Sequence, residues 1–223
     1  MSQAKPAGQI GVWGCKGSGK STYLLDRLAD RSRVVALDVT GDLASEGFKL
    51  CRTTDAVRVA MLANWSGFRI VLQPRSGSEM RVLNQLCALL IKAQSGYKQH
   101  RKIMTLAVDE MADAFPAHGG LKYVPNFARL CSLGRHDGIE VFGCSQRIAE
   151  VHSKFRGNCS EAVVFINIEP NDRDRSAATL GVKRDRVEAL EPLHFLHRLG
   201  PKNVIEGTVT PGKRKKQKTP FSP

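Results

Sequence analysis

The sequence contains 223 residues, of which 34 are Lys or Arg and 21 are Asp or Glu, so the formal net charge at pH 7 is +13. This length predicts one domain of ordinary size, and the basic excess favours a polyanionic partner such as nucleic acid, with a merely soluble basic surface as the alternative. No apolar run approaches the roughly 20 residues that span a bilayer, and the six cysteines show no metal-ligand spacing, so we expect neither a transmembrane segment nor a cysteine metal site.

The first predicted elements are a strand at residues 10–14, a glycine-rich turn and a helix at residues 21–29. The segment GVWGCKGSGKST fits the pattern G-x-x-x-x-G-K-[ST], in which backbone amides and a helix N-terminus surround a chain of phosphates. A strand before the pattern and a helix after it are the context that this phosphate loop requires. We therefore predict that ATP binds to the residues of this loop, which are Gly14, Cys15, Lys16, Gly17, Ser18, Gly19, Lys20, Ser21 and Thr22.

Apolar runs then alternate with helical patterns, which is typical of a mostly parallel sheet covered by helices on both faces. Near-continuous apolar segments such as EAVVFIN suit central strands, which are buried on both faces. Further strands are predicted at residues 34–38, 69–72, 103–109, 139–144 and 162–166, and helices after Gly19, Ser78, Leu121 and Gln146. The sequence therefore predicts an α/β fold.

The strand at residues 103–109 leads into two adjacent carboxylates, Asp109 and Glu110, in the segment KIMTLAVDEMAD. Open parallel sheets bind ligands at the carboxyl ends of their strands, so this pair has the arrangement of a Walker B motif. We expect Asp109 and the hydroxyl of Ser21 to hold Mg²⁺, because magnesium keeps several waters and takes few protein oxygens. Glu110 is placed to orient and deprotonate an attacking water, and an acidic cap on the next helix is the alternative.

A third polar group follows the next strand, in the segment VFGCSQR, where Gln146 comes directly after the apolar run. A neutral amide at this strand tip can hydrogen-bond a γ-phosphate and the lytic water. We predict that Gln146 senses which nucleotide is bound, and an ordinary surface glutamine is the alternative.

The chain changes character after Asn167, where a short helical segment is followed by LGPKNVIEGTVTP, which indicates a hairpin or an extended arm. The end, PGKRKKQKTPFSP, is a basic run with too few apolar residues to offset its chain entropy. We predict four regions: an N-terminal extension at residues 1–9, an ATPase core at 10–181, a C-terminal arm at 182–211 that packs on or beside the core, and a basic flexible tail at 212–223.

Four segments together resemble the HerA/FtsK superfamily of DNA-pumping ATPases: GCKGSGKST, ALDVTGDL, VDEMAD and LGRHDGIEVFGCSQR. In that superfamily an Asp-containing turn follows the second strand, Asp-Glu closes Walker B, and a G-R-x-x-G-I segment leads into a strand that ends in Gln-Arg. The resemblance covers residues 10–181, and GRHDGIEVFGCSQR is its most specific part. It implies a RecA-like P-loop NTPase core with a short C-terminal extension.

Within that superfamily the chain is most similar to the genome-packaging ATPases of icosahedral, tectivirus-like phages with internal membranes. The resemblance implies an enzyme that hydrolyses ATP to ADP and phosphate while it pumps DNA into a preformed capsid. It also implies a portal or capsid-vertex protein as a partner, and the host cytoplasm and the packaging vertex of the virion as locations. Another HerA/FtsK-type DNA pump or phage-assembly ATPase is the alternative.

Other classes of P-loop protein can be compared on the same residues. ParA-like ATPases carry an extra lysine at the first variable position of the loop, which here is Cys15, while Lys16 comes second, so that class is disfavoured. A GTPase needs a guanine-binding N-K-x-D-like segment, and NIEPNDRD supplies none. A soluble phosphotransferase remains an alternative, although the Asp-Glu pair and the Gln-ended strand suit activation of water.

The resemblance implies a ring, because a single RecA-like domain leaves its nucleotide at an edge where a neighbouring subunit supplies an arginine. We predict a homo-oligomeric ring, a hexamer, with DNA in its central channel. Arg135, in LGRHDGI, is the first candidate for the arginine that acts in trans. The other candidates are Arg129, Arg156, Arg173 and Arg175.

Two basic segments are candidates for contact with DNA, at residues 97–102 and 213–218. Both lack the aromatic spacing that stacks on single-stranded bases, so we predict contact with the phosphate backbone without sequence preference. Two alternatives remain: the tail docks on a portal or capsid vertex, or both segments are only solvated surface.

Overall fold

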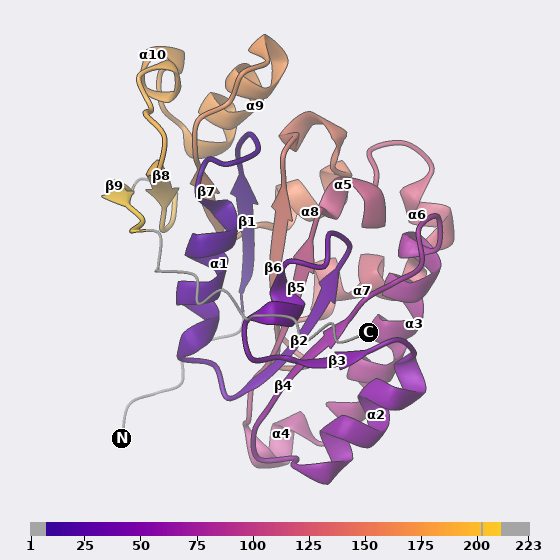
Figure 1. Ribbon diagram of the computed structural model, residues 1–223. Helices are drawn as coiled ribbons and strands as arrows, with labels where there is room; N and C mark the ends of the chain where they lie inside the picture. Colours follow the sequence, from indigo (N-terminus) through magenta and orange to yellow (C-terminus); the bar gives the residue numbers. More distant parts are fainter. Residues whose placement is uncertain (1–7, 202, 211–223) are drawn as a thin grey trace, which may run out of the picture.

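Nine strands form one sheet in the part of the chain that the computed structural model describes, residues 8–201 and 203–210 (Figure 1). Their order across the sheet is β3-β4-β2-β5-β6-β1-β7-β8-β9. All pairings from β3 to β7 are parallel, and β8 and β9 extend the sheet as antiparallel strands. The strands are β1 (Gln9–Trp13), β2 (Arg33–Asp38), β3 (Lys49–Cys51), β4 (Phe68–Leu72), β5 (Met104–Asp109), β6 (Ile139–Ser145), β7 (Glu161–Val164), β8 (His194–Arg198) and β9 (Val204–Thr208). This sheet confirms the predicted α/β fold.

Helices cover both faces of the sheet, as expected. Side chains of α1 and the 3₁₀ turn η1 pack on one face, and those of α2, α3, α5, α7 and α8 pack on the other. The helices and turns are α1 (Lys20–Ala29), η1 (Leu43–Ser45), α2 (Thr54–Ala63), α3 (Glu79–Ala93), α4 (Tyr97–His100), α5 (Met111–Ala114), α6 (Gly120–Tyr123), α7 (Pro125–Leu133), η2 (Ile148–Glu150), α8 (Ser153–Asn158), α9 (Pro170–Leu180) and α10 (Arg184–Glu188). In the described residues, no helix has the length and apolar character that crossing a membrane requires.

The two layers of the core follow from the alternation of side chains along the buried strands. In β2, Val34 and Ala36 join the apolar cluster on the α1 face, whereas Val35 and Leu37 join the cluster on the α3 face. Every residue of β2 is buried, and its central residues, VVAL, are apolar without polar alternation, as central parallel strands require.

The sequence pattern does not predict β3 and α2. β3 is an edge strand with two of its three residues exposed, so it has no apolar run. α2 begins after Thr53, whose hydroxyl accepts a hydrogen bond from the Ala56 amide at 3.2 Å. The helix expected after Gln146 begins only at Ser153, because the turn η2 comes first.

The position of β6 between β1 and β5 brings the ends of three strands together. Trp13 pairs with Ser145, and Val108 pairs with Gly143, so these strands end at the same edge of the sheet. β2 ends beside β5 on the far side, where Asp38 pairs with Asp109.

The contact between β1 and β6 depends on two glycines that lie opposite each other, Gly11 and Gly143. A Cβ on Gly143 would lie 2.5 Å from the Met111 methyl and 2.6 Å from the Phe155 ring, and a Cβ on Gly11 would overlap the Trp13 indole. The indole and the Phe155 ring meet edge to face, with centroids 6.1 Å apart. The two glycines therefore make room for the aromatic packing beneath the site.

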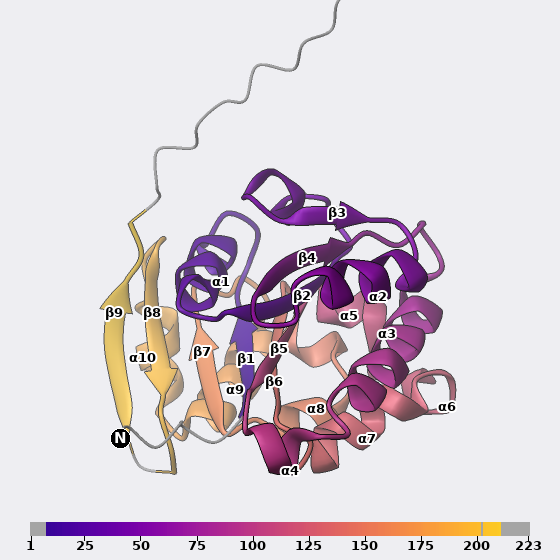
Figure 2. The ribbon, with the colours of Figure 1, turned by 90° about the horizontal axis from the view of Figure 1, so that it is seen from below.

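The C-terminal strands lie beside β7 and α1 at one end of the sheet, opposite β3 (Figure 2). The segment before β8 contacts the glycine-rich loop, because the Leu193 amide donates to the Ser18 carbonyl at 3.1 Å. The Val209 amide in turn donates to the Leu193 carbonyl at 2.9 Å. The boundary between a core and an arm at residue 182 stays a prediction, and the proposed tail and residues 1–7 lie outside the described residues.

Candidate active site

The glycine-rich loop connects the end of β1 to the start of α1 at the carboxyl edge of the sheet. Its start is fixed by two backbone hydrogen bonds, from the Gly14 amide to the Ser145 carbonyl at 3.3 Å and from the Cys15 amide to the Ile166 carbonyl at 2.9 Å. Gly14 and Gly19 have φ angles of 152° and 114°, which residues with a Cβ rarely adopt. The loop conformation therefore requires the glycines of the sequence pattern.

Helix α1 directs its N-terminus at this loop. Its cap residue is Gly19, no acidic side chain lies in its first turn, and no side chain caps it among the residues described. The first backbone amides of a helix carry a partial positive charge and lack intrahelical partners, so they attract an anion. Ser21 and Thr22, both half-buried, occupy the first turn beside these amides.

Lys20 folds over the loop from the first position of α1. Its Nζ donates to the Gly14 carbonyl at 2.7 Å and to the Cys15 carbonyl at 2.9 Å. Burial lowers the pKa of Lys20, while nearby acidic groups, including Glu110 and Asp109, oppose this effect. Within the loop Lys16 and Gly17 are exposed, whereas Ser18 is buried.

Asp109 ends β5 and is held from the neighbouring strand β2. The Thr40 hydroxyl donates to Asp109 Oδ2 at 2.8 Å, and the turn that carries Thr40 is fixed by the buried Asp38, which accepts from the Gly41 amide at 2.7 Å and from the Leu43 amide at 2.8 Å. Burial raises the pKa of Asp109 to about 6; the Thr40 hydrogen bond opposes this, and the carboxylates of Asp38 and Glu110 add to it.

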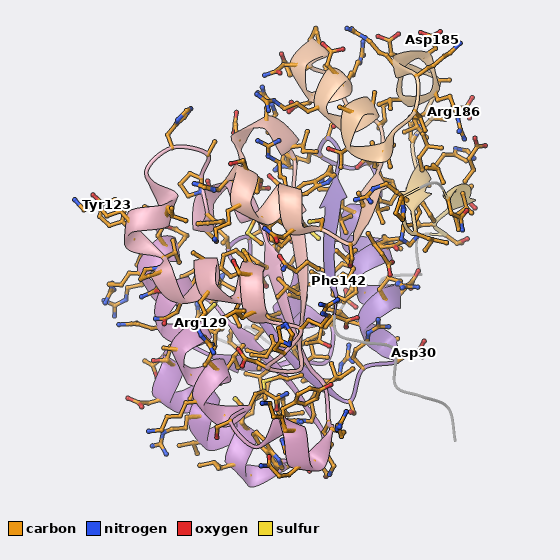
Figure 3. The ribbon with its side chains drawn as sticks, turned by 180° about the vertical axis from the view of Figure 1, so that it is seen from behind. Asp30, Tyr123, Arg129, Phe142, Asp185 and Arg186 are labelled. Carbon is orange, nitrogen blue, oxygen red and sulfur yellow. The ribbon has the colours of Figure 1, made fainter. Side chains whose placement is uncertain are left out.

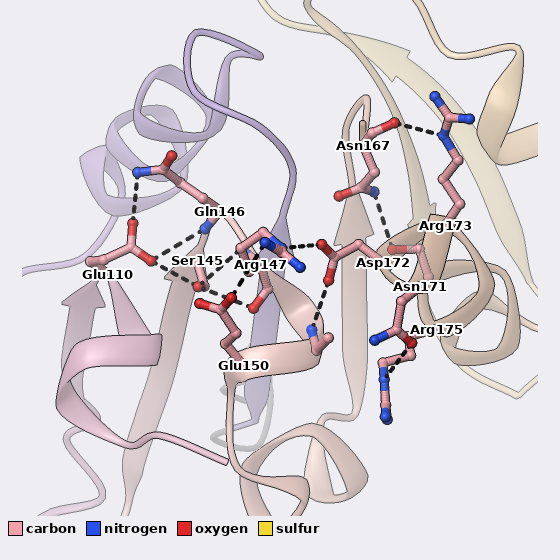
Figure 4. Close-up of polar contacts among 12 residues, drawn as sticks. Glu110, Ser145, Gln146, Arg147, Glu150, Asn167, Asn171, Asp172, Arg173 and Arg175 are labelled. Atoms are coloured by element: carbon pink, nitrogen blue, oxygen red, sulfur yellow. Dashed lines mark hydrogen bonds and ion pairs between the residues drawn. The ribbon is translucent and has the colours of Figure 1, made fainter. Parts of the chain in front are cut away.

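Glu110 is held against the tip of β6 (Figure 4). Its Oε1 accepts from the Ser145 hydroxyl at 2.8 Å and from the Gln146 amide at 3.3 Å, and its Oε2 accepts from Gln146 Nε2 at 3.1 Å. Its backbone φ of 58° is unusual for a residue with a side chain. The structure therefore brings together two of the predicted catalytic residues, Glu110 and Gln146.

The oxygen donors at this edge are of the kind that a magnesium ion takes. The residues 8–201 and 203–210 contain no group of three or more His, Cys, Asp or Glu side chains that could hold a metal. Mg²⁺ needs no such cage, because it keeps most of its waters and takes one or two protein oxygens together with phosphate oxygens. The Asp109 carboxylate and the Ser21 hydroxyl are oxygen donors of the required kind.

The sequence pattern does not point to three residues of this site. Thr40 lies in the quoted ALDVTGDL segment, and Ser145 immediately precedes Gln146, but their partners come from other strands. Arg147 contacts the buried carboxylate of Asp172 on α9, whose other oxygen accepts from the Ala149 amide at 2.9 Å (Figure 4). Only the order of the strands in the sheet reveals these contacts.

The first trans-acting candidate, Arg135, is exposed and lies outside this site. It precedes β6, whereas Gln146 follows it, and seven residues of strand separate the two edges by about 23 Å. The segment 97–102 shares the edge of Arg135, because the Tyr97 ring packs on Gly138. The other candidate arginines each donate to a group of their own chain: Arg129 to Asp137, Arg156 to Val151, Arg173 to Asn167 and Arg175 to Asn171.

A glycine-rich loop connects the buried strand β1 to the helix α1, and two carboxylates follow β5, which is separated from β1 in the sheet by β6 alone. This arrangement defines the P-loop NTPase fold. No protein-family model matches the chain, and no curated protein matches it.

Solved structures do match the chain. The genome packaging NTPase B204 from Sulfolobus turreted icosahedral virus 2, in complex with AMPPCP, superposes with a TM-score of 0.74 and 17% identity over 92% of this chain and 99% of that one. EssC from Geobacillus thermodenitrificans gives 0.62 and 12% identity over 91% of this chain and 39% of that one. The pCW3 conjugation coupling protein TcpA gives 0.60 and 16% identity over 91% of this chain and 60% of that one. These neighbours agree with the resemblance seen in the sequence, and at such identities they establish the fold.

Replacing Lys20 by Ala should abolish binding of ATP, because the backbone amides of the loop cannot replace its charge on the β and γ phosphates. Titration calorimetry with ATP and magnesium measures this, with Lys49→Ala, an exposed lysine on the edge strand β3, as the control. Equal affinity in Lys20→Ala and the parent would show that the loop does not bind phosphates.

Proposed function

We propose that this chain is an ATP-driven DNA translocase, and specifically the genome-packaging motor that pumps DNA into a preformed viral capsid. The observation that carries the proposal is the contact of Glu110 with Ser145 and Gln146 at the edge where the phosphate loop ends. A carboxylate placed beside a neutral amide at this position suits activation of a water molecule. The likeness to the packaging NTPase B204 supports the choice of substrate.

The proposed chemistry is hydrolysis of ATP. The loop amides and Lys20 bind the β and γ phosphates, and Ser21 and Asp109 would hold Mg²⁺, which when bound supplies positive charge to the phosphate oxygens. Glu110 accepts a proton from the attacking water, and Gln146 orients that water. The water oxygen forms a bond to the γ-phosphorus while the bond to the bridging oxygen breaks, and ADP leaves with the electron pair.

Two alternatives stay open. Another HerA/FtsK-type DNA pump is favoured by the likeness to the conjugation coupling protein TcpA. The second alternative is a soluble phosphotransferase, which would transfer the γ-phosphate to an acceptor hydroxyl instead of water. The contacts of Glu110 do not favour such an acceptor. For the packaging motor we further propose a portal or capsid-vertex partner, and the host cytoplasm and packaging vertex as its locations.

The proposed assembly is a hexameric ring in which a neighbouring subunit completes each site. Arg135 is exposed and therefore accessible to a neighbouring subunit. It can reach that subunit's phosphates only if the amino edge of its own sheet faces the carboxyl edge of the neighbouring subunit's sheet. Arg173 and Arg175 lie on α9, which follows β7 at the carboxyl edge.

Replacing Glu110 by Gln should keep ATP binding and reduce hydrolysis by about 10² to 10⁴-fold, because shape is preserved and the base is lost. Ser145→Ala should lower kcat by about tenfold with KM unchanged, since one hydrogen bond that positions Glu110 is removed. Ser66→Ala, an exposed serine that bonds Asn64, is the matched control. Hydrolysis at the parent rate in Glu110→Gln would place the base elsewhere.

Arg135→Ala should leave ATP binding intact and cut hydrolysis by about 10³-fold if Arg135 acts in trans. Mixing it with Lys20→Ala subunits should restore part of the activity, because mixed rings contain interfaces with an intact Lys20 and an intact Arg135. Steady-state phosphate release by the mixture measures this. No recovery where native mass spectrometry detects mixed rings would exclude Arg135 and favour an arginine on α9.

Duplex DNA should stimulate phosphate release by the parent protein, and its binding should weaken with salt by about 0.9 log unit per log unit for each phosphate neutralised. A coupled phosphate assay and fluorescence anisotropy measure the two effects. A monomer that ignores DNA and transfers phosphate to a small acceptor would overturn the translocase proposal.

A further inference from the structure

The segment between α5 and α7, residues 115–124, forms a loop that presents large apolar side chains to solvent. Leu121 is 47% exposed and Tyr123 is 57% exposed, both in the short helix α6. In Figure 3 Tyr123 points outward from the margin of the molecule, far from the buried Phe142. We call this segment the α6 loop.

The α6 loop combines this apolar surface with positive charge. Lys122 Nζ lies 5.7 Å from the centroid of the Tyr123 ring, and His118 is exposed on the same loop. Residues 115–124 contain no Asp or Glu, whereas the exposed Asp113 lies just before them in α5. An exposed lysine beside an exposed aromatic ring suits a nucleic acid strand, because the ammonium binds phosphate and the ring packs on sugar or base.

The α6 loop is joined at one end to Glu110. The four residues of α5 connect Glu110 to Phe115, which is buried and packs edge to face on Phe127 with centroids 5.1 Å apart. A Cβ on Gly120 would lie 3.1 Å from the Phe115 ring, so the start of α6 rests on that ring.

The same loop is also bonded to the segment that follows Gln146. The Ala117 amide donates to the Glu150 carbonyl at 2.7 Å, and the His152 amide donates to the Phe115 carbonyl at 3.0 Å. The Phe115 and His152 rings are stacked with centroids 4.7 Å apart. The α6 loop is therefore connected through the backbone to Glu110 at one end and bonded to the segment after Gln146.

We infer that the α6 loop is the surface through which this chain binds the DNA backbone and couples it to the nucleotide site. The inference rests on the proposed translocase function. Lys122 pairs with a phosphate, and Tyr123 and Leu121 pack against the adjacent sugars. The contact is independent of base sequence, since none of these side chains reads base edges by paired hydrogen bonds.

Two observations favour DNA over a protein partner for this loop. Two exposed apolar side chains, Leu121 and Tyr123, cover far less than the roughly 800 Å² that each partner of a stable protein complex buries. The excess of basic over acidic residues in the chain, 34 to 21, also favours a polyanion. Residues 97–102 lie at the opposite edge of the sheet, so contact there would add affinity without a connection to Glu110.

The test compares the full-length parent with the double variant Lys122→Ala/Tyr123→Ala and with each single variant. Lys49→Ala is the charge-matched control, because Lys49 is exposed on the edge strand β3. Phosphate release without DNA should be unchanged, because neither side chain lies at the phosphate loop. With duplex DNA the double variant should lose most of the stimulation, and Lys122→Ala should make the salt dependence of binding shallower by about 0.9.

Each other outcome overturns the inference in a distinguishable way. A double variant that DNA stimulates as strongly as the parent refutes the α6 loop alone and leaves the translocase proposal standing. A parent that neither binds DNA nor responds to it refutes both proposals. Loss of ring assembly with unchanged DNA affinity per subunit makes the loop a subunit contact, and equal losses in Lys49→Ala and Lys122→Ala make the effect one of net charge. Circular dichroism confirms that the exposed substitutions leave the fold intact.

Discussion

The strand β6 lies between the strand of the phosphate loop and the strand of the two carboxylates, and this order determines the geometry of the candidate site. Neighbouring strands are about 4.8 Å apart, so β1 and β5 end about 10 Å from each other. Ser145 and Gln146 occupy the space between them. Glu110 can therefore be bonded by β6 while it stays close to the loop, and Asp109 faces β2 instead. Each carboxylate of the pair is held by a different neighbouring strand, which gives the two groups separate environments although they are adjacent in sequence.

The segment after Gln146 connects this site to two outer parts of the molecule. On one side it bonds the α6 loop through Glu150 and His152. On the other side Arg147 and the Ala149 amide bond the buried carboxylate of Asp172, which fixes α9. A buried carboxylate needs such partners, because desolvation penalises an unpaired charge. Residues 145–152 thus carry contacts to Glu110, to an exposed loop and to a helix at the carboxyl edge.

Local patterns were sufficient to predict the phosphate loop, the main strands and the adjacent carboxylates, because each is encoded by consecutive residues with a defined period or motif. The contacts of Ser145 and Thr40 could not be predicted in this way, since they depend on which strands become neighbours. The edge strand β3 lacks an apolar run, so its pattern gives no signal. Arg135 is a different case: the strand predicted at residues 139–144 already separates it from Gln146, and β6 places the two at opposite edges of the sheet.

The paired glycines of β1 and β6 have a consequence for the genetics of such a protein. Any single substitution at Gly11 or Gly143 introduces a Cβ into space that the Trp13 indole, the Met111 methyl and the Phe155 ring already fill. The smallest replacement, alanine, would let the chain fold at low temperature with these rings displaced, and the displaced packing would give way on warming. These two positions are therefore where a screen for conditional alleles should find temperature-sensitive mutants whose lesion lies beneath the nucleotide edge and not in it.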